Sequence, residues 1–327
     1  MLNWIVIGSG DVVNRLVKNS LNTKSSKVSY VFSKDYNQSK KIAKKYNYGI
    51  AIKDIDIALK DKKINCAYIA TPPNDHFYYI NLLAKNKINI LCEKPIVLKK
   101  NDLKKIKSLC TKNRVSFYGS FYRREQERFK YVKKLLNKSL VGKPIAFDYK
   151  MHHSPETHPT APIFKSIKKK MVPWRFNQKV SGGGNFLDMG LHVLDFLMDI
   201  FGNIEKYQFI KNNSKRYYDV EESFILNLIF KNRIIGQGSW HSTISKKEDV
   251  MNIYGTKGTI EFSFNFNNKV ILRIGDKTII KKIKFITPPH KPIIKKVIKI
   301  FKNSIKTKKI FVDDDSLNLT LFQTKMF

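Results

Sequence analysis

The sequence predicts an α/β fold whose first part is a doubly wound parallel sheet. Three observations lead to this prediction. Short apolar strands alternate with helical periodicity up to about residue 120, glycines follow the first strand, and the segments after residue 201 are short and rich in β-forming residues. Alternating strands and crossover helices are typical of a parallel sheet that is covered on both faces.

The strands of this first part are expected where apolar runs end in turn residues. The runs are NWIVIGSG from residue 3, KVSYVFS from 27, NCAYIATPP from 65, INILCEKP from 88 and VSFYGSFY from 115. Helical spacing of apolar residues follows most of them, at 11–22, 35–47, 75–86 and 99–112. Strand–helix repeats of this length predict parallel pairing between successive strands.

The second part of the chain is expected to form a separate, β-rich domain. Its strand candidates are KYQFI, SFILNLIF, RIIGQGSW, VMNIYG, TIEFSF, VILRI and TIIKKIKF. We place the domains at 1–120 and 121–327. The basic stretch from Lys291 has Ile293, Val297, Ile300 and Phe301 on one helical stripe. Such a helix can lie on a membrane surface, but we expect the stripe to pack on the protein.

Composition narrows the class of protein. Lys and Arg number 62 against 26 acidic residues, but only nine are arginine, and the lysines are spread over every segment. Nucleic-acid readers usually concentrate charge and use arginine, so we expect no nucleic-acid partner. Cys66, Cys92 and Cys110 form no C-x-x-C pair, and no apolar run reaches 18 residues. A cytoplasmic protein without disulfides, zinc or a membrane span is therefore expected.

The carboxyl end of the first strand carries a candidate phosphate-binding loop. In doubly wound sheets, ligands bind outside the carboxyl ends of the strands. Gly8, Ser9 and Gly10 follow the strand, and Asp11 and Val12 open the next helix. Glycines let the backbone approach a pyrophosphate, and the helix N-terminus supplies amide donors. Val13 replaces the third glycine of the dinucleotide fingerprint, so an ordinary strand–helix turn is the alternative.

The end of the second strand bears on the choice of cofactor. NAD-binding sheets usually place an acid there for the ribose 2′-hydroxyl, whereas NADP requires a cation instead. Ser33 and Lys34 occupy this end, and a hydroxyl with an ammonium can bind a 2′-phosphate. The alternative is that Asp35, one residue displaced, binds the ribose. We expect NADP, with NAD possible.

Several motifs in order resemble a known family. CEKP, ATPPNDH, WRFNQKVSGGGNFLDMGLHVLDFLMDIFG and IYGTKGTIEF are similar to motifs of the glucose–fructose oxidoreductase/inositol dehydrogenase (Gfo/Idh/MocA) family. The likeness runs nearly end to end, and is greatest to NADP-dependent 1,5-anhydrofructose-type sugar reductases and dihydrodiol dehydrogenases. It implies a Rossmann domain followed by an α+β domain with a large, open, mainly antiparallel sheet. It also implies an NAD(P)-dependent oxidoreductase acting on a sugar, polyol or related cyclic substrate.

The resemblance also assigns residues. It implies cofactor contacts, at the ribose and nicotinamide, for Thr71, Pro72, Asn74, His76 and Glu93. Trp174 and Arg175 match a pair near the cofactor or substrate, and Tyr122 and Arg123 would line the substrate site. A homodimer or homotetramer through the open sheet is expected as well, because alternating apolar residues leave both of its faces partly hydrophobic.

The helix after Gly182–Gly184 carries polar residues in an apolar setting. Asp188 and His192 are four residues apart, so they share a helix face, and Asp195 lies near it. The alternative is a capping aspartate and a core histidine. Hydride transfer at a carbonyl or alcohol carbon requires a coupled proton transfer. Lys94, His192 and Asp188 suit this chemistry and match the family's catalytic positions, leaving open whether Lys94 or His192 delivers the proton.

Two further alternatives remain. His152, His153 and His158 resemble a metal cluster, but no carboxylate spacing supports one, so we expect a loop near the substrate pocket and no metal. A nicotinamide-binding sensor of the same fold is the rival function, because fold does not determine function. Retention of Lys94, Asp188 and His192 together favours the enzyme.

Overall fold

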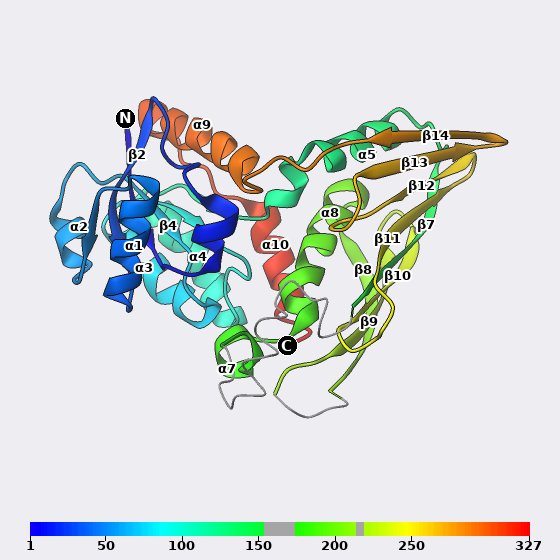
Figure 1. Ribbon diagram of the computed structural model, residues 1–327, viewed down its shortest axis with the longest axis horizontal. Helices are drawn as coiled ribbons and strands as arrows, with labels where there is room; N and C mark the ends of the chain where they lie inside the picture. Colours follow the sequence, from blue (N-terminus) through cyan, green and yellow to red (C-terminus); the bar gives the residue numbers. More distant parts are fainter. Residues whose placement is uncertain (154–173, 214–218) are drawn as a thin grey trace. The chain divides into compact units, whose positions relative to one another are not determined.

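The computed structural model describes residues 1–153, 174–213 and 219–327, and the chain forms two compact units (Figure 1). The first unit comprises Met1–Tyr122, Ile286–Lys325 and Phe327, and the second comprises Arg123–Phe285 and Met326. The expected second domain ran from 121 to 327. In the structure the C-terminal segment from Ile286 instead belongs to the first unit. Among the described residues, no helix is both long and apolar enough to cross a membrane.

The first unit is built on a six-stranded parallel sheet, as the sequence predicted. The strand order is β3-β2-β1-β4-β5-β6, and every pairing is parallel. The strands are β1 (Leu2–Ile7), β2 (Ser26–Phe32), β3 (Ile50–Ile52), β4 (Cys66–Ile69), β5 (Asn89–Cys92) and β6 (Phe117–Gly119). The order reverses between β1 and β4, which is the point where doubly wound sheets bind ligands.

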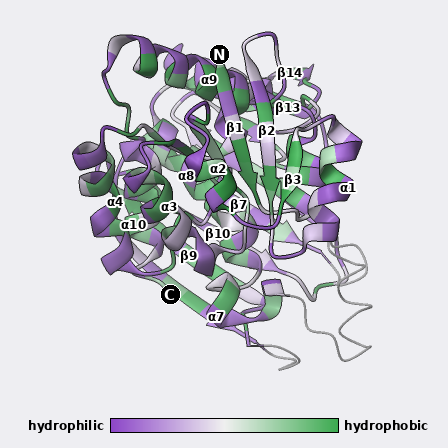
Figure 2. Cartoon of the chain, turned by 90° about the vertical axis from the view of Figure 1, so that its left-hand side faces the viewer, coloured by the Kyte–Doolittle hydropathy of each residue, from purple (hydrophilic) through white to green (hydrophobic). Residues whose placement is uncertain are grey.

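Helices connect these strands. They are the π-helical turn η1 (Val12–Val17), α1 (Tyr36–Tyr46), α2 (Asp56–Lys60), the 3₁₀ turn η2 (Pro73–Asp75), α3 (His76–Lys85) and α4 (Lys100–Asn113). Figure 2 shows much of β1 and β3 in hydrophobic green, while α1 and α4 alternate between green and purple. Sheet residues such as Trp4 and Ile5 are fully buried, so one face of each amphipathic helix covers the apolar strands.

The C-terminal segment completes the first unit. Helix α9 (Lys291–Thr307) buries Ile293, Val297 and Phe301, and Phe301 stacks on Trp4 of β1 with ring centroids 5.8 Å apart. This confirms that the apolar stripe packs on the protein, although Ile300 is only half-buried. Helix α10 (Asp314–Gln323) packs on α4 and β6. These apolar contacts explain why the segment belongs to the first unit.

The second unit contains an eight-stranded mixed sheet. Its order is β14-β13-β12-β11-β7-β10-β9-β8, and all pairs are antiparallel except β7 with β10. The strands are β7 (Pro144–His152), β8 (Ile204–Asn212), β9 (Ser223–Phe230), β10 (Ile235–His241), β11 (Glu248–Gly255), β12 (Gly258–Phe262), β13 (Lys269–Ile274) and β14 (Lys277–Lys282). The large, mainly antiparallel sheet implied by the resemblance is thus confirmed.

Helices cover one face of this sheet. The helices after residue 121 and before β8 include α5 (Glu127–Asn137), α7 (Gln178–Ser181), the π-helical turn η5 (Phe186–Gly190) and α8 (Leu191–Phe201), with short 3₁₀ turns η3 (Tyr122–Glu125) and η4 (Trp174–Phe176). Of these, α5 and α8 pack on the sheet. Phe129 of α5 and Phe196 of α8 meet edge to face, 5.2 Å between ring centroids, and both contact Phe262 of the sheet. Aromatic side chains thus form the core between helices and strands.

Candidate functional site

The loop after β1 requires glycine at its first position. Gly8 has a φ of +113°, and a Cβ there would lie 2.5 Å from the carbonyl oxygen of Ala70. Its amide donates to the carbonyl of Phe32 at 2.8 Å, so the turn is held against the ends of both β2 and β4. A Cβ on Gly10 would meet nothing within 4 Å. The loop therefore leaves room for a close ligand, as a dinucleotide pyrophosphate needs.

The residues around Ser33 contact the glycine loop. The hydroxyls of Ser9 and Ser33 are 2.7 Å apart. The exposed Lys34 pairs with Asp75, Nζ to Oδ2 2.8 Å, and this hydrogen bond raises the pKa of Lys34. Asp35 caps α1 by accepting a hydrogen bond from the amide of Gln38 at 3.0 Å. The alternative ribose ligand thus already has a local structural role.

A buried carboxylate lies at the end of β5. Glu93 is 5 % exposed and accepts hydrogen bonds from the Tyr68 hydroxyl at 2.7 Å and from His290 Nε2 at 3.0 Å. Burial alone would raise the pKa of Glu93, but the charge and hydrogen bonds of its partners lower it overall. Burial raises the pKa of Tyr68 well above its usual range, so the phenol remains a donor. Glu93 is thus held as a carboxylate.

His290 was missed in the sequence analysis. It is fully buried, its ring stacks on Tyr122 with centroids 4.3 Å apart, and its amide donates to the carbonyl of Leu16 in η1 at 3.1 Å. A single histidine after two prolines belongs to no recognisable motif. Because His290 is far from Glu93 in sequence, no local pattern could indicate their contact. Only the return of the C-terminal segment to the first unit brings these side chains together.

His76 connects the loops that follow β4 and β5. Its Nε2 is 2.9 Å from the carbonyl oxygen of Thr71, and its Nδ1 is 2.9 Å from that of Pro95. The ring is fully buried, and burial lowers the pKa of His76. Lys94, between Glu93 and Pro95, is half-buried. The predicted residues of the first unit are thus brought together at the carboxyl edge of the sheet.

Pro72 and Asn74 lie at the start of the same edge loop. Pro72 precedes the 3₁₀ turn η2, and Asn74 is exposed within it. The buried Oγ1 of Thr71 has no hydrogen-bond partner among the described residues. On the glycine loop, Asp11 pairs with Arg15, and Val12 begins η1.

The glycine run of the second unit permits a close backbone approach. A Cβ on Gly184 would lie 2.3 Å from the carbonyl oxygen of Glu221. The amide of Gly184 donates to Glu221 Oε2 at 2.7 Å, and burial raises the pKa of this carboxyl. Glu221 was also missed, because a Glu-Glu pair before a strand reads as solvated surface.

Asp188 and His192 follow this turn. Asp188 is half-buried within the π-helical turn η5, and His192 is buried in the first turn of α8. The sequence analysis assumed a uniform α-helix of 3.6 residues per turn. The π-helical turn changes that spacing, and such turns are frequent at functional sites.

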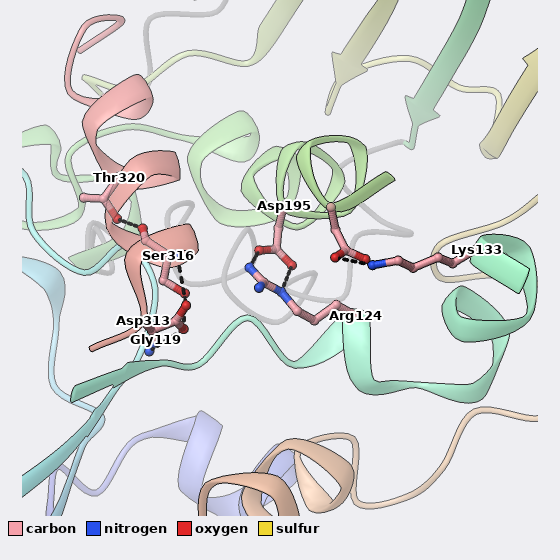
Figure 3. Close-up of polar contacts among 8 residues, drawn as sticks. Gly119, Arg124, Lys133, Asp195, Asp313, Ser316 and Thr320 are labelled. Atoms are coloured by element: carbon pink, nitrogen blue, oxygen red, sulfur yellow. Dashed lines mark hydrogen bonds and ion pairs between the residues drawn. The ribbon is translucent and has the colours of Figure 1, made fainter. Parts of the chain in front are cut away.

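Asp195, the third polar residue of this helix, has a structural partner. Its two carboxylate oxygens accept hydrogen bonds from Nε and Nη2 of Arg124, with Nε to Oδ2 2.9 Å (Figure 3). Both side chains are largely buried. One turn further along α8, Asp199 pairs with Lys133 of α5 at 2.6 Å. These ion pairs explain two of the three aspartates on the apolar helix.

The remaining predicted residues of the second unit lie in different surroundings. The Arg123 guanidinium is buried and donates to the carbonyl of Phe264 and to Asn265 Oδ1, each at 2.6 Å. The Arg175 guanidinium lies over the ring of Trp174, 4.4 Å from its centroid, and that ring is 37 % exposed.

The histidine cluster falls partly outside the described residues, since His158 is not among them. His152 and His241 face each other across β7 and β10 with ring centroids 5.0 Å apart, and the amide of His153 donates to the carbonyl of His241. In the part of the chain that the structure describes, no group of three or more ligating side chains is arranged to hold a metal ion.

Comparisons with known proteins agree with this architecture. Residues 2–120 match the model of an oxidoreductase family with an NAD-binding Rossmann fold, and residues 129–261 match a GFO/IDH/MocA C-terminal domain. Oxidoreductase P35 of Formosa agariphila is 28% identical over 309 residues, covering 92% of this chain and 91% of that protein.

Two solved structures share the fold. A levoglucosan dehydrogenase in complex with NADH and levoglucosan has a TM-score of 0.79 and 16% identity, covering 99% of this chain and 97% of that one. A 3-ketoreductase from Actinomadura kijaniata in complex with NADP and TDP-benzene has a TM-score of 0.80 and 14% identity, with the same coverage. This chain belongs to the GFO/IDH/MocA family of oxidoreductases, and its first unit is the NAD(P)-binding Rossmann domain.

Proposed function

We propose that the protein transfers a hydride between nicotinamide C4 of NADP(H) and a carbonyl or alcohol carbon of a sugar, polyol or related cyclic substrate. The observation that carries this proposal is the set of residues at the carboxyl edge of the first sheet. There Lys94 directly follows the buried Glu93, beside the loop that His76 binds. The substrate class is supported by the levoglucosan dehydrogenase and the 3-ketoreductase that share the fold.

The nicotinamide would supply or accept the hydride, and the protein must move a proton at the substrate oxygen. Lys94 is a cation that can stabilise negative charge on that oxygen. Histidine is a common general acid or base in catalysis, so His192 can serve in proton transfer, and Asp188 can fix its orientation. We propose that these three side chains serve one reaction, in which either Lys94 or His192 delivers the proton.

NADP is the proposed cofactor. Ser33 and Lys34 directly follow β2, at the place where an acid would favour NAD, and Asp35 caps α1. The remaining proposed cofactor contacts are Gly8, Ser9, Gly10, Asp11, Val12, Thr71, Pro72, Asn74, Glu93, Trp174 and Arg175. His76 would act through the loops it binds, because its ring is fully buried. Tyr122 and Arg123 are proposed for the substrate side.

The test is a screen of sugars, polyols, inositols and aryl diols with NADP(H) and NAD(H), followed by the absorbance of the reduced nicotinamide. Turnover of at least one cyclic polyol or sugar is expected. Tight binding of NADP(H) without turnover of any of these compounds would favour the alternative, a catalytically silent nicotinamide sensor.

We also propose a cytoplasmic homodimer or homotetramer that uses the open face of the second sheet. The strand register puts Ile210, Ile225, Ile235 and Tyr254 on the same face, and they are 66%, 37%, 54% and 40% exposed. Apolar surface of this kind is typical of an interface. Small-angle scattering over a range of concentrations tests it, and a monomer at every concentration would contradict it. Cell fractionation tests the location.

A further inference from the structure

We propose that Asp75 limits the preference of the protein for NADP(H), by competing with the 2′-phosphate of the cofactor for the ammonium group of Lys34. The inference rests on the proposed function, in particular on NADP(H) as the cofactor of the first unit. It adds a residue that selects between the two cofactors. Three observations support it: the place of the ion pair in the sheet, the exposure of Lys34, and the absence of a capping bond from Asp75 to α3.

The ion pair between Lys34 and Asp75 spans the carboxyl end of strand β1. Lys34 follows β2 and Asp75 lies after β4, and these two strands flank β1 in the sheet. Nζ of Lys34 and Oδ2 of Asp75 are 2.8 Å apart. Phe32 at the end of β2 and Tyr79 of α3 connect the same two segments, with ring centroids 6.4 Å apart. The pair therefore lies beside the glycine loop, where residues after the second strand meet the adenosine ribose of a dinucleotide.

Lys34 can exchange one anionic partner for another. Its side chain is 77% exposed, and Asp75 is the carboxylate that pairs with it. Ion pairs at the surface are weak, because water screens both charges. A phosphate monoester carries a charge of about −1.5 to −2 at pH 7 and has three acceptor oxygens, more than a carboxylate offers. A 2′-phosphate can therefore take the place of Asp75 on the ammonium group.

The carboxylate of Asp75 does not cap the helix that follows it. Asp75 directly precedes α3, where an aspartate commonly accepts a hydrogen bond from an amide of the first turn. No such bond forms among the described residues, and the carboxylate instead accepts one from Lys34. Binding of NADP(H) to Lys34 thus includes the breaking of this pair. NAD(H) has a hydroxyl in place of the 2′-phosphate and leaves the pair intact.

Direct repulsion between Asp75 and the phosphate is the rival explanation, and a double-mutant cycle with Lys34 separates the two. Asp75→Asn removes the charge and keeps the size of the side chain, whereas Lys34→Gln removes the ammonium group. If Asp75 competes for Lys34, the gain in affinity from Asp75→Asn disappears when Lys34→Gln is also present. Repulsion alone would give the same gain with and without Lys34.

The matched control is Asp314→Asn. Asp314 pairs with Lys107 of α4 at the same distance, 2.8 Å, and both side chains are exposed. Its helix α10 packs on β6, which is the edge strand at the opposite end of the sheet from β3. This variant therefore removes one carboxylate of a lysine pair from the same unit, four strands away from β2.

The experiment measures dissociation constants at one fixed, low ionic strength. NADPH and NADH are titrated by nicotinamide fluorescence, and adenosine 2′,5′-bisphosphate and ADP by calorimetry. We expect Asp75→Asn to tighten binding of the two ligands with a 2′-phosphate by about twofold to fivefold, as for loss of a competing surface ion pair, and to leave NADH and ADP unchanged. Asp75→Ser, a second variant without the charge, should give the same gain. Asp314→Asn should bind all four ligands like the unmodified protein.

Three results would overturn the inference: unchanged NADPH binding by both Asp75 variants, an equal gain for ADP, or an undiminished gain in the Lys34→Gln background. Weaker NADH binding by Asp75→Asn would also contradict it, because Asp75 would then bind the ribose hydroxyl itself. If the unmodified protein binds neither NADPH nor NADH, the proposed function fails. That result is distinct from normal NADPH binding that the Asp75 variants do not change.

Discussion

Two buried carboxylates, one in each unit, show how differently the same burial can be used. Asp195 on α8 meets the fork of Arg124, which matches a carboxylate in shape and charge. Glu93 at the end of β5 is bound by Tyr68 and His290, and His290 retains a buried nitrogen without a partner among the described residues. Burial of charge alone therefore does not mark a ligand site. The two sites differ because Asp195 has a bidentate cationic partner, whereas the histidine beside Glu93 has a ring nitrogen that no described residue binds.

The largest effect on stability is expected at Asp195. Asp195→Ala leaves the Arg124 guanidinium buried without its carboxylate, which should lower the free energy of unfolding by about 3–5 kcal/mol. The affinity of the folded protein for NADP(H) should not change. The control is Asp199→Ala, whose pair with the half-exposed Lys133 should contribute about 1 kcal/mol or less. Chemical denaturation measures the free energy of unfolding of both variants. Equal losses of stability would contradict the expected difference between the buried pair and the exposed pair.

The next largest effect is expected on turnover. Lys94→Ala should lower kcat by roughly a hundredfold or more, because a proton or charge-stabilising group is lost at the reacting oxygen. Folding and cofactor affinity should remain nearly intact. The exposed Lys100 of α4 provides the control, and Lys100→Ala should have normal kcat.

The His192→Ala variant tests whether Lys94 and His192 act together in one proton transfer. The single variant should also be slow, and the double variant should lose much less than the product of the two single effects. Near-normal turnover of Lys94→Ala, measured with an active substrate, would refute the catalytic assignment and favour the sensor.

The ionisation of Glu93 should make the free energy of unfolding depend on pH, and this contribution should be absent from a Glu93→Gln variant. The lowered pKa means that its carboxylate stabilises the folded state above the unfolded pKa, about 4.3, and that this contribution is lost as pH falls through the folded pKa. Glu93→Gln should therefore cost about 1.5–3 kcal/mol at pH 7. The difference from the unmodified protein should shrink below pH 4 in denaturation series, and a constant difference would contradict the charged pair.

The smallest effect is expected at Ser33. Ser33→Asp should weaken NADP(H) binding by about tenfold, roughly 1.4 kcal/mol, through repulsion of the 2′-phosphate, and shift preference towards NAD(H). Asp35→Ala is the control, which should cost about 1 kcal/mol of stability as a lost helix cap but leave the preference alone. Equal use of NAD(H) by the unmodified protein would defeat the NADP proposal.

The elements with a local signal could be predicted from the sequence. Apolar runs ending in glycine or proline gave β1, β4 and β5, and the ligand-bearing edge follows from their parallel order. Strand β7 was missed although Phe147, Tyr149 and Met151 alternate as buried residues, because its polar neighbours and the histidines were interpreted as a loop. Its central place in the sheet is a property of pairing, which no single segment encodes.

The features that depend on distant contacts could not be predicted. The π-helical turn around Asp188 is accompanied by the packing of Phe186 on Phe224, with ring centroids 3.9 Å apart, and periodicity does not report such contacts. The role of His290 depends on its contact with Glu93, which is far away in sequence. The CEKP motif identified Glu93, but no motif indicated His290, which binds Glu93 in the structure.

The division of the first unit into two stretches of sequence has a consequence for biosynthesis. A ribosome completes Arg123–Phe285, the body of the second unit, before it releases α9 and α10. At roughly 5–20 residues per second, the N-terminal strands wait on the order of ten seconds or more. During that time Trp4 lacks Phe301 and Glu93 lacks His290, so the nascent Rossmann sheet has an apolar face and a carboxylate that both miss a partner. Of the two units, the cofactor domain is thus begun before the other and completed after it.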